Sequence, residues 1–259
     1  MGGLEKGTNL PKEREMSETR RAVVTFYQTK YAFLDTVLKR FRRYASKIGA
    51  EMVEINLDDS KNVFLDKFFH VGTLQYERCI VLDVDILIRS DAPDLFSIVP
   101  EDSVGAYDEG SSFFLSTRTE TKDVDVRYQA YRHLIEWCGF DPSALSGKYS
   151  FSSPMRYYNL GVVVYNREAM DLHNSLTQEQ VSRLNKYKGW NCVEQTLFSY
   201  LVLNSGIKTF HLPACFNQLP CNKCADYLKT SFFSHYAGLG DGKGAYIVED
   251  DRVWSEQEL

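Results

Sequence analysis

The segment RCIVLDVDILI, residues 78–88, places two carboxylates, Asp83 and Asp85, inside an apolar run with the length of a buried strand. An ionised carboxylate that is buried without a partner is costly, so this strand either ends at Asp83 with solvated acids or delivers both acids to a cation. Residues two apart on an extended strand point the same way. Hard divalent ions such as Mn²⁺ and Mg²⁺ prefer carboxylate oxygens and often share phosphate oxygens, so the pair predicts a metal bound to a diphosphate.

Two further motifs place polar side chains beside apolar elements. In YYNLGVVVYN, Asn159 lies two residues before Gly161 and a buried strand. Its amide can meet a hydroxylated ligand where the glycine lets the backbone approach closely, and the alternative is an ordinary turn. In NCVEQTLFSYLV, Glu194 and Gln195 open an apolar helix, where such groups either bind a ligand or cap the helix.

The stretch FFSHYAGLG ends an apolar strand at His235 and continues in small residues. Neutral imidazole is a good ligand for Mn²⁺, and a glycine-rich turn beside it leaves backbone amides free for phosphate. The alternative is a loop histidine whose hydrogen bonds are satisfied locally.

These motifs lie on strands and helices that alternate along the chain. This alternation predicts an α/β fold with a mostly parallel central sheet flanked by helices. Ligands bind such sheets outside the carboxyl ends of the strands, which is where Asp83 and Asp85 fall. The predicted strands are 21–27, 50–57, 79–88, 103–110 and 159–166, and the predicted helices are 32–49, 63–76, 126–140 and 191–204.

The chain is predicted to form a single domain over residues 21–259. Residues 1–20 read as a disordered or vector-derived lead, because they contain no apolar core. The polar segment 109–125 is a candidate for a mobile lid or acceptor loop, and the alternative is an ordinary surface loop.

Composition narrows the class of protein. With 259 residues and 44% hydrophobic content, the chain can bury a sizeable core, and a net charge of −5 with dispersed cations does not suggest nucleic-acid binding. No apolar run reaches 18 residues, so we predict a cytoplasmic protein. The basic run KRFRRYASK, residues 39–47, predicts a solvated helix face, with a peripheral membrane or anionic acceptor contact as the alternative.

Six cysteines in a chain of this length do not form a disulfide framework, so the compartment is predicted to be reducing. His211, Cys215, Cys221 and Cys224 could supply four zinc ligands. A single CxxC is a weak signal, and ordinary loop cysteines are the preferred interpretation.

The order of the motifs resembles a known family. DVD, then YYNLGVVVYN, then an acid and Gln opening a helix, then FNQLP and SHYAG, is similar to the family-8-type glycosyltransferases of the GT-A fold, a Rossmann-like fold. The resemblance is to lipooligosaccharide galactosyltransferases and glycogenin-like enzymes, and it covers roughly residues 20–240. It implies an enzyme that moves a sugar from a nucleoside diphosphate sugar, a UDP-sugar, to a hydroxyl of a glycan acceptor. It also implies Mn²⁺ or Mg²⁺ as cofactor and retention of configuration.

The resemblance also implies roles for individual residues. Asp83, Asp85 and His235 correspond to the metal ligands. Where the family has a Lys-Pro-Trp run after its His-x-x-Gly motif, this chain has Lys243 five residues beyond Gly238. The residues that would line the reacting face are Glu194, Gln195 and Asp108, and those that would bind the nucleotide and the donor sugar are Thr25, Tyr27, Lys67, Asp83, Asn159, Gly161, Gly238 and Lys243.

Three alternatives remain open at this point. An inverting transferase would use Asp108 or Glu194 as general base on the acceptor hydroxyl. A catalytically inactive protein would bind a sugar nucleotide without turning it over. A haloacid-dehalogenase-like phosphatase also carries a strand with DxD, but it needs Thr or Val where Leu87 stands and places the motif near the N-terminus.

Overall fold

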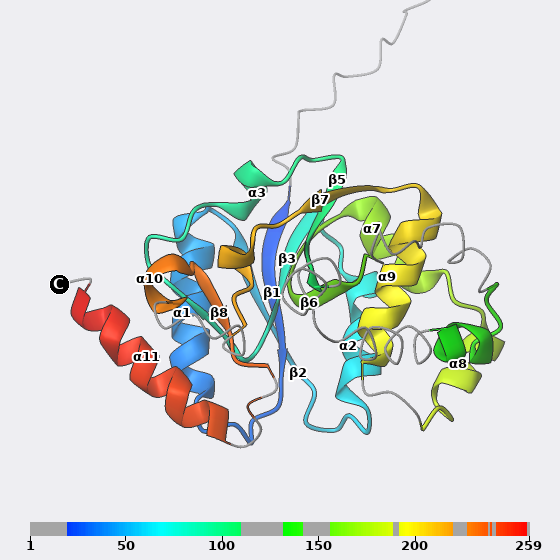
Figure 1. Cartoon of the computed structure of the whole chain (residues 1–259), viewed down its shortest axis with the longest axis horizontal. Coiled ribbons are helices and arrows are strands. Elements are labelled where there is room, and N and C mark those ends of the chain that lie inside the picture. Colours follow the sequence, from blue (N-terminus) through cyan, green and yellow to red (C-terminus); the bar gives the residue numbers. More distant parts are fainter. Residues whose placement is uncertain are drawn as a thin grey trace, which may run out of the picture.

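The computed structural model describes residues 20–109, 132–141, 156–188, 192–219, 227–237, 239 and 242–257. Over these residues, a six-stranded sheet lies between two layers that contain the helices (Figure 1). The predicted α/β class is confirmed. The strands of this sheet are β1 (Arg21–Tyr27), β2 (Glu51–Asn56), β3 (Arg78–Asp83), β5 (Ser103–Asp108), β6 (Tyr158–Asn166) and β7 (Lys208–His211).

Helices cover both faces of the sheet (Figure 1). On one side lie α1 (Leu34–Lys47) and α11 (Lys243–Gln257), and on the other α2 (Val63–Thr73), α7 (Arg167–Asp171) and α9 (Val193–Ser205). The shorter helical elements are α3 (Leu95–Ile98), η1 (Leu172–Asn174), α8 (Gln178–Leu184), η2 (Ala214–Phe216), α10 (Tyr227–Thr230) and residues 132–137.

The two large apolar clusters of the core lie one on each face of the sheet. Successive strand residues alternate between the two clusters: Val24 and Val81 belong to the cluster beneath α2 and α9, while Val23 and Ile80 belong to the cluster beneath α1. This alternation follows from the two-residue period of a strand. Because both faces of the sheet are covered, the central strands β1, β3 and β6 read as apolar runs, whereas the edge strands β2 and β7 do not.

The sheet has the order β2-β1-β3-β6-β5-β7. The pairs β1–β2, β1–β3 and β5–β7 are parallel, whereas β6 runs antiparallel to both of its neighbours, β3 and β5. The predicted mostly parallel sheet is therefore confirmed. The reversed direction of β6 brings the start of that strand to the edge where the other strands end, so Asn159 and Gly161 lie near Asp83.

The predicted strand 79–88 is wrong as a single element. Strand β3 ends at Asp83, Val84 and Asp85 form a turn, and β4 (Ile86–Ile88) pairs with β8 (Phe233–His235) in a separate two-stranded sheet. Ile86 is the register partner of His235. Because β4 pairs with β8 directly after this turn, Asp85 lies beside His235. The strand therefore ends at Asp83, and both acids lie close to the His235 imidazole.

The basic run 39–47 is less solvated than the sequence predicted. Phe41 and Tyr44 are buried, as expected from their spacing, but Arg40 is buried too, at 4% exposure. The Arg40 guanidinium forms an ion pair of 2.6 Å with Asp251 and so joins α1 to α11. Lys47 donates to the backbone oxygens of Ser90 and Ala92.

Several expectations fall on residues outside those described. They include residues 1–19, residues 110–125 of the segment proposed as a lid, residues 126–131 of the predicted helix 126–140, and Cys221, Cys224 and Gly238. The single-domain assignment for 21–259, the lead at 1–20 and the zinc set therefore stay predictions. Among the described helices, none is long and apolar enough to cross a bilayer.

Candidate functional site

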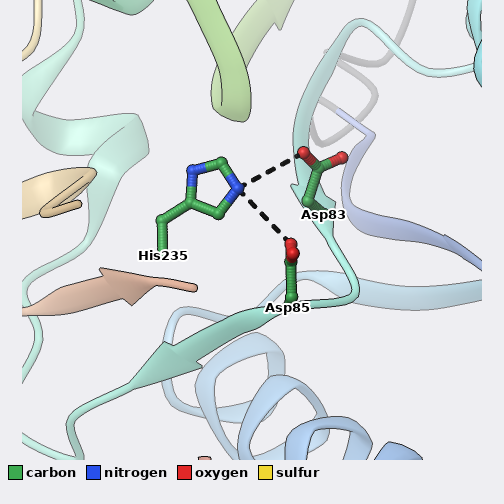
Figure 2. A group of neighbouring side chains, drawn as sticks. All are labelled: Asp83, Asp85 and His235. Atoms are coloured by element: carbon green, nitrogen blue, oxygen red, sulfur yellow. Dashed lines mark ion pairs between the residues drawn. The ribbon is translucent and has the colours of Figure 1, made fainter. Parts of the chain in front are cut away.

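Asp83, Asp85 and His235 gather at the carboxyl end of β3, and Figure 2 shows both carboxylates on the same side of the imidazole. The His235 Nε2 atom lies 3.4 Å from Asp85 Oδ1 and 3.7 Å from Asp83 Oδ2. One ligand atom from each residue lies within 4.8 Å of the other two. The structure thus brings His235 to the acids, although some 150 positions separate them in sequence.

Two lysines balance the two carboxylates. The ammonium group of Lys67, on α2, contacts Asp83, and Lys243 Nζ, at the start of α11, donates to Asp85 Oδ2 over 2.8 Å. Burial disfavours charge on Asp85, but the His235 imidazole and the Lys243 ammonium outweigh it, and the Asp85 pKa lies below its usual range. Burial lowers the His235 pKa, but Asp85 and Asp83 outweigh it, and the net shift is upward.

The three side chains fit a hard divalent cation. Two carboxylates and one imidazole offer the oxygen and nitrogen donors that Mn²⁺ accepts, and oxygen donors also suit Mg²⁺. The Lys67 and Lys243 ammonium groups already lie at these carboxylates, and the same carboxylates raise the pKa of the His235 imidazole, so the acidic pair attracts positive charge. Among the described residues, this is the group of metal-binding side chains close enough to share an ion.

Gly161 is required by the position of the imidazole. A methyl group on Gly161 would overlap the Cε1 and Nδ1 atoms of the His235 ring. The sequence predicted that this glycine permits a close backbone approach, and the group that approaches is the His235 ring.

A group of amide and carboxylate side chains lies next to the metal-binding cluster. Glu109 Oε2 accepts hydrogen bonds from Asn159 Nδ2 and from Gln195 Nε2, each at 3.1 Å. Asn159 and Gln195 are buried at 6% and 8% exposure. The structure therefore brings together Asn159 of β6, Gln195 of α9 and Glu109 at the end of β5. Their amide and carboxylate groups are suited to binding sugar hydroxyls.

Glu194 is the buried carboxyl of this group. It is 8% exposed, and its Oε2 atom is buried and has no hydrogen-bond partner among the residues that the structure describes. Burial raises the Glu194 pKa from 4.5 to about 7, while Lys67 lowers it and Asp83 raises it by smaller amounts. Glu194 is thus a carboxyl that both holds and releases a proton near neutral pH.

The pH dependence of stability tests the burial of Glu194. Because folding raises its pKa from 4.5 to about 7, the folded state holds a proton that the unfolded state releases, and stability falls as pH rises through this window. A shift of this size corresponds to about 3–4 kcal/mol. We expect Glu194→Gln to be more stable than wild type by about this amount at pH 8, and by much less at pH 5. Urea unfolding in EDTA measures both differences, and equal differences at the two pH values would contradict the raised pKa.

Other predicted site residues have structural contacts. Asp108 is buried at 2% exposure, and its Oδ1 atom accepts the Tyr157 backbone N–H. Thr25 is fully buried, and its hydroxyl donates to the Leu82 backbone oxygen, which joins β1 to β3. Tyr27 is half-buried at the carboxyl end of β1.

The sequence did not single out Glu109 or Asn217. Glu109 follows Asp108 at the end of β5, and neighbouring strand residues point to opposite faces, so the choice between the two acids depended on knowing the face. Asn217 lies in FNQLP, a motif noted in the sequence without a role. It is fully buried, and its Oδ1 atom lies 2.8 Å from His235 Nδ1.

The comparisons with known proteins support the fold. No protein-family model matches the chain, and no curated protein matches its sequence. Its structure is similar to a glycosyltransferase involved in the glycosylation of the major capsid of PBCV-1, with a TM-score of 0.54, 11% identity, and coverage of 92% of this chain and 99% of that chain. It is also similar to the glycosyltransferase GlyE of Streptococcus pneumoniae TIGR4, with a TM-score of 0.51 and 14% identity over 92% of this chain and 62% of that chain.

These similarities define the class of fold. The chain has a glycosyltransferase fold, with a mostly parallel six-stranded sheet and an Asp-Asp-His group at the carboxyl end of β3. At 11–14% identity, the likeness concerns the fold, and the activity must be argued from the site.

Proposed function

We propose that this protein is a metal-dependent glycosyltransferase that moves a sugar from a UDP-sugar to a hydroxyl group of a glycan acceptor. The observation that carries the proposal is the cluster of Asp83, Asp85 and His235 at the carboxyl edge of a sheet with a glycosyltransferase fold. The proposed cofactor is Mn²⁺, or Mg²⁺ in its place. When bound, the ion would neutralise the charge that develops on the departing diphosphate.

Lys67 and Lys243 are the proposed cationic partners of the diphosphate. The Lys67 ammonium contacts Asp83 and also donates to the Leu160 backbone oxygen at 3.3 Å. These two contacts hold it at the carboxyl end of β3. Lys243, which lies 158 positions after Asp85 in the sequence, donates a hydrogen bond to the Asp85 carboxylate. In the free protein, the two ammonium groups neutralise the carboxylates of Asp83 and Asp85. In the proposed complex with a nucleoside diphosphate sugar, they would neutralise phosphate oxygens.

Asn159, Gln195 and Glu109 are the proposed sugar-binding residues. Their hydrogen bonds to one another hold the three polar groups in fixed orientations, so little side-chain entropy is lost when hydroxyls bind. Glu194 adds a carboxyl that is about half protonated near pH 7 and that donates or accepts at the same surface. The Gly238 amide belongs to the proposed phosphate-binding turn, outside the described residues.

The proposed nucleoside site is an open hollow of about 650 Å³ at the carboxyl end of β2. Its wall includes Asp66 and His70 from α2, the helix that also carries Lys67, whose ammonium group contacts Asp83. Tyr27 ends β1 beside Asn56. Carboxylates and amides on this wall are suited to ribose hydroxyls. The residues that line the hollow are Asn56, Leu57, Asp58, Asp59, Ser60, Asp66 and His70.

We also propose retention of configuration. An inverting enzyme needs a carboxylate base on the acceptor hydroxyl. The Asp108 carboxylate is buried at 2% exposure and already accepts the Tyr157 backbone N–H, so it is poorly placed for this role, and Glu194 is the base that the inverting alternative would have to use. Analysis of the product anomer by NMR tests this: a product with the donor's anomeric configuration is expected, and the opposite anomer would support the inverting alternative.

A thermal-shift experiment with UDP tests the proposed donor and cofactor together. We expect UDP to stabilise the protein when Mn²⁺ is present and to have little effect in excess EDTA, because the ion joins the acidic cluster to the diphosphate. A ligand at 100 times its dissociation constant adds about 2.7 kcal/mol of stability. Equal stabilisation in EDTA would remove the metal from the proposal. Stabilisation without sugar transfer to any glycan would favour an inactive sugar-nucleotide-binding protein.

A further inference from the structure

A chain of buried amides connects the backbone of β6 to His235. The Gly161 backbone N–H donates to Asn159 Oδ1 at 2.8 Å, and Asn217 Nδ2 donates to the same oxygen at 2.8 Å. Asn217 Oδ1 in turn lies 2.8 Å from His235 Nδ1. All of these side chains are buried, and Asn217 is fully so.

The orientation of every group in this chain follows from one backbone donor. A backbone N–H can only donate, so the Asn159 atom that faces Gly161 must be the oxygen. The Asn217 atom that faces this oxygen must then be the amide nitrogen, which leaves the Asn217 oxygen toward the imidazole. An amide oxygen can only accept, so His235 Nδ1 must carry a hydrogen.

The protonated Nδ1 determines what the other ring nitrogen can do. In a neutral imidazole with hydrogen on Nδ1, Nε2 carries the lone pair. His235 Nε2 is the atom that faces Asp83 and Asp85 (Figure 2). The buried amides therefore favour the tautomer in which His235 binds a cation held by the two carboxylates.

The backbone fixes Asn217 in this place. The Gln218 N–H donates to the Phe233 oxygen at 3.0 Å, and the His235 N–H donates to the Gln218 oxygen at 2.9 Å. The segment that follows η2 is thus hydrogen-bonded to β8 on either side of Ser234. Asn217 and His235 are brought together by the backbone before their side chains interact.

We propose that Asn217 is a positioning residue that sets the tautomer of His235 and couples the metal-binding cluster to Asn159. This inference rests on the proposed function, because it concerns the metal that the cluster would hold. Asn159 belongs to the proposed sugar-binding surface, and Asn217 is hydrogen-bonded both to Asn159 and to His235. A change in the hydrogen bonds of Asn159 would therefore reach the His235 ring through Asn217.

Binding of Mn²⁺ alone, measured by electron paramagnetic resonance, tests the role of Asn217. Asn217→Ala removes the acceptor for His235 Nδ1–H, and we expect Mn²⁺ to bind about 10–100-fold more weakly than to wild type. Asn217→Asp puts a carboxylate oxygen in place of the amide oxygen as the acceptor for His235 Nδ1–H, but it loses the donor to Asn159 Oδ1, so Mn²⁺ should bind more tightly than to Asn217→Ala and within about tenfold of wild type. Rescue by aspartate separates tautomer control from a general packing role.

Two further variants complete the test. Asn159→Leu leaves Asn217 in place but removes the oxygen that orients it, so Mn²⁺ affinity should fall about threefold to tenfold; this variant also serves if Asn217→Ala does not fold. The control is Asn166→Ala, which removes another buried asparagine, the N-cap of α7, away from the cluster. It should lower the melting temperature without changing Mn²⁺ affinity.

The outcomes distinguish this inference from the proposed function. Wild-type affinity in both Asn217→Ala and Asn159→Leu, or equal loss in Asn217→Ala and Asn217→Asp, would overturn the positioning role while leaving the metal site intact. A wild-type protein that binds no Mn²⁺ would overturn the metal dependence of the proposed function, and the role of Asn217 with it.

Discussion

Asp85→Asn is expected to abolish metal-dependent nucleotide binding in a protein that still folds. The amide has nearly the shape of the carboxylate but no charge, and a divalent cation depends on charged oxygens. Asp85 is 8% exposed and contacts both His235 and Lys243, so the substitution leaves the Lys243 ammonium and the His235 imidazole facing a neutral side chain. We expect the Mn²⁺ dissociation constant to rise at least about 100-fold, or about 2.7 kcal/mol, and sugar transfer to be lost.

The control for Asp85→Asn is Asp91→Asn. Asp91 forms an exposed ion pair with Arg89, and its side chain is 63% exposed. Pairs of this kind contribute about 0–1 kcal/mol, so Mn²⁺ binding and activity should match wild type. Calorimetry of Mn²⁺ binding and circular dichroism of the metal-free proteins make the comparison. If Asp85→Asn is folded and binds Mn²⁺ normally, Asp85 is no ligand; if it does not fold, a structural role for the carboxylate is favoured.

The parts of the site that lie on continuous elements were predictable from the sequence. Apolar runs identified β1, β3 and β6, because both faces of the sheet are covered and these strands are buried over all but their end residues. Glu194 and Gln195 were placed at the start of a helix, and α9 begins at Val193. The region from residue 205 onward was predicted least well, and β7 and α11 were not anticipated.

The break between β3 and β4 was not predictable from hydrophobicity. Residues 86–88 are as buried as the end of β3, so the apolar pattern continues through the turn at Val84 and Asp85. What separates the two strands is pairing: β3 joins the central sheet, while β4 pairs with β8, which lies far along the chain. Periodicity within a segment carries no information about such a partner.

Asn217 and Glu109, the partners that orient the predicted residues Asn159 and Gln195, were missed for the same reason. Asn217 bonds to Asn159 across 58 positions, and Gln195 bonds to Glu109 across 86. Each of these side chains, taken alone in the sequence, resembles an ordinary loop or cap residue. Their roles follow from the antiparallel direction of β6, which brings Asn159 to the carboxyl edge of the sheet, and this direction appears only in the folded chain.

His235→Ala is expected to weaken Mn²⁺ and donor binding together. The substitution removes the nitrogen ligand, and we expect the Mn²⁺ affinity and the rate of sugar transfer to fall about 100-fold or more. His235 is 3% exposed and contacts Asp85 and Asn217, so its loss also leaves polar groups without partners. The metal-free variant should therefore be less stable than wild type by about 1–3 kcal/mol while remaining folded. Urea unfolding in EDTA and Mn²⁺ titration measure the two effects separately.

Combining His235→Ala with Asn217→Ala shows whether the two residues act as one unit. Asn217 reaches the cluster through the His235 ring, so once the imidazole is gone, Asn217→Ala should have no further effect on Mn²⁺ affinity. If the two losses instead add, Asn217 influences the ion by another route. Wild-type Mn²⁺ affinity in His235→Ala would show that the ion is held without the imidazole, and the acidic pair would then have to bind it through the carboxylates and the diphosphate alone.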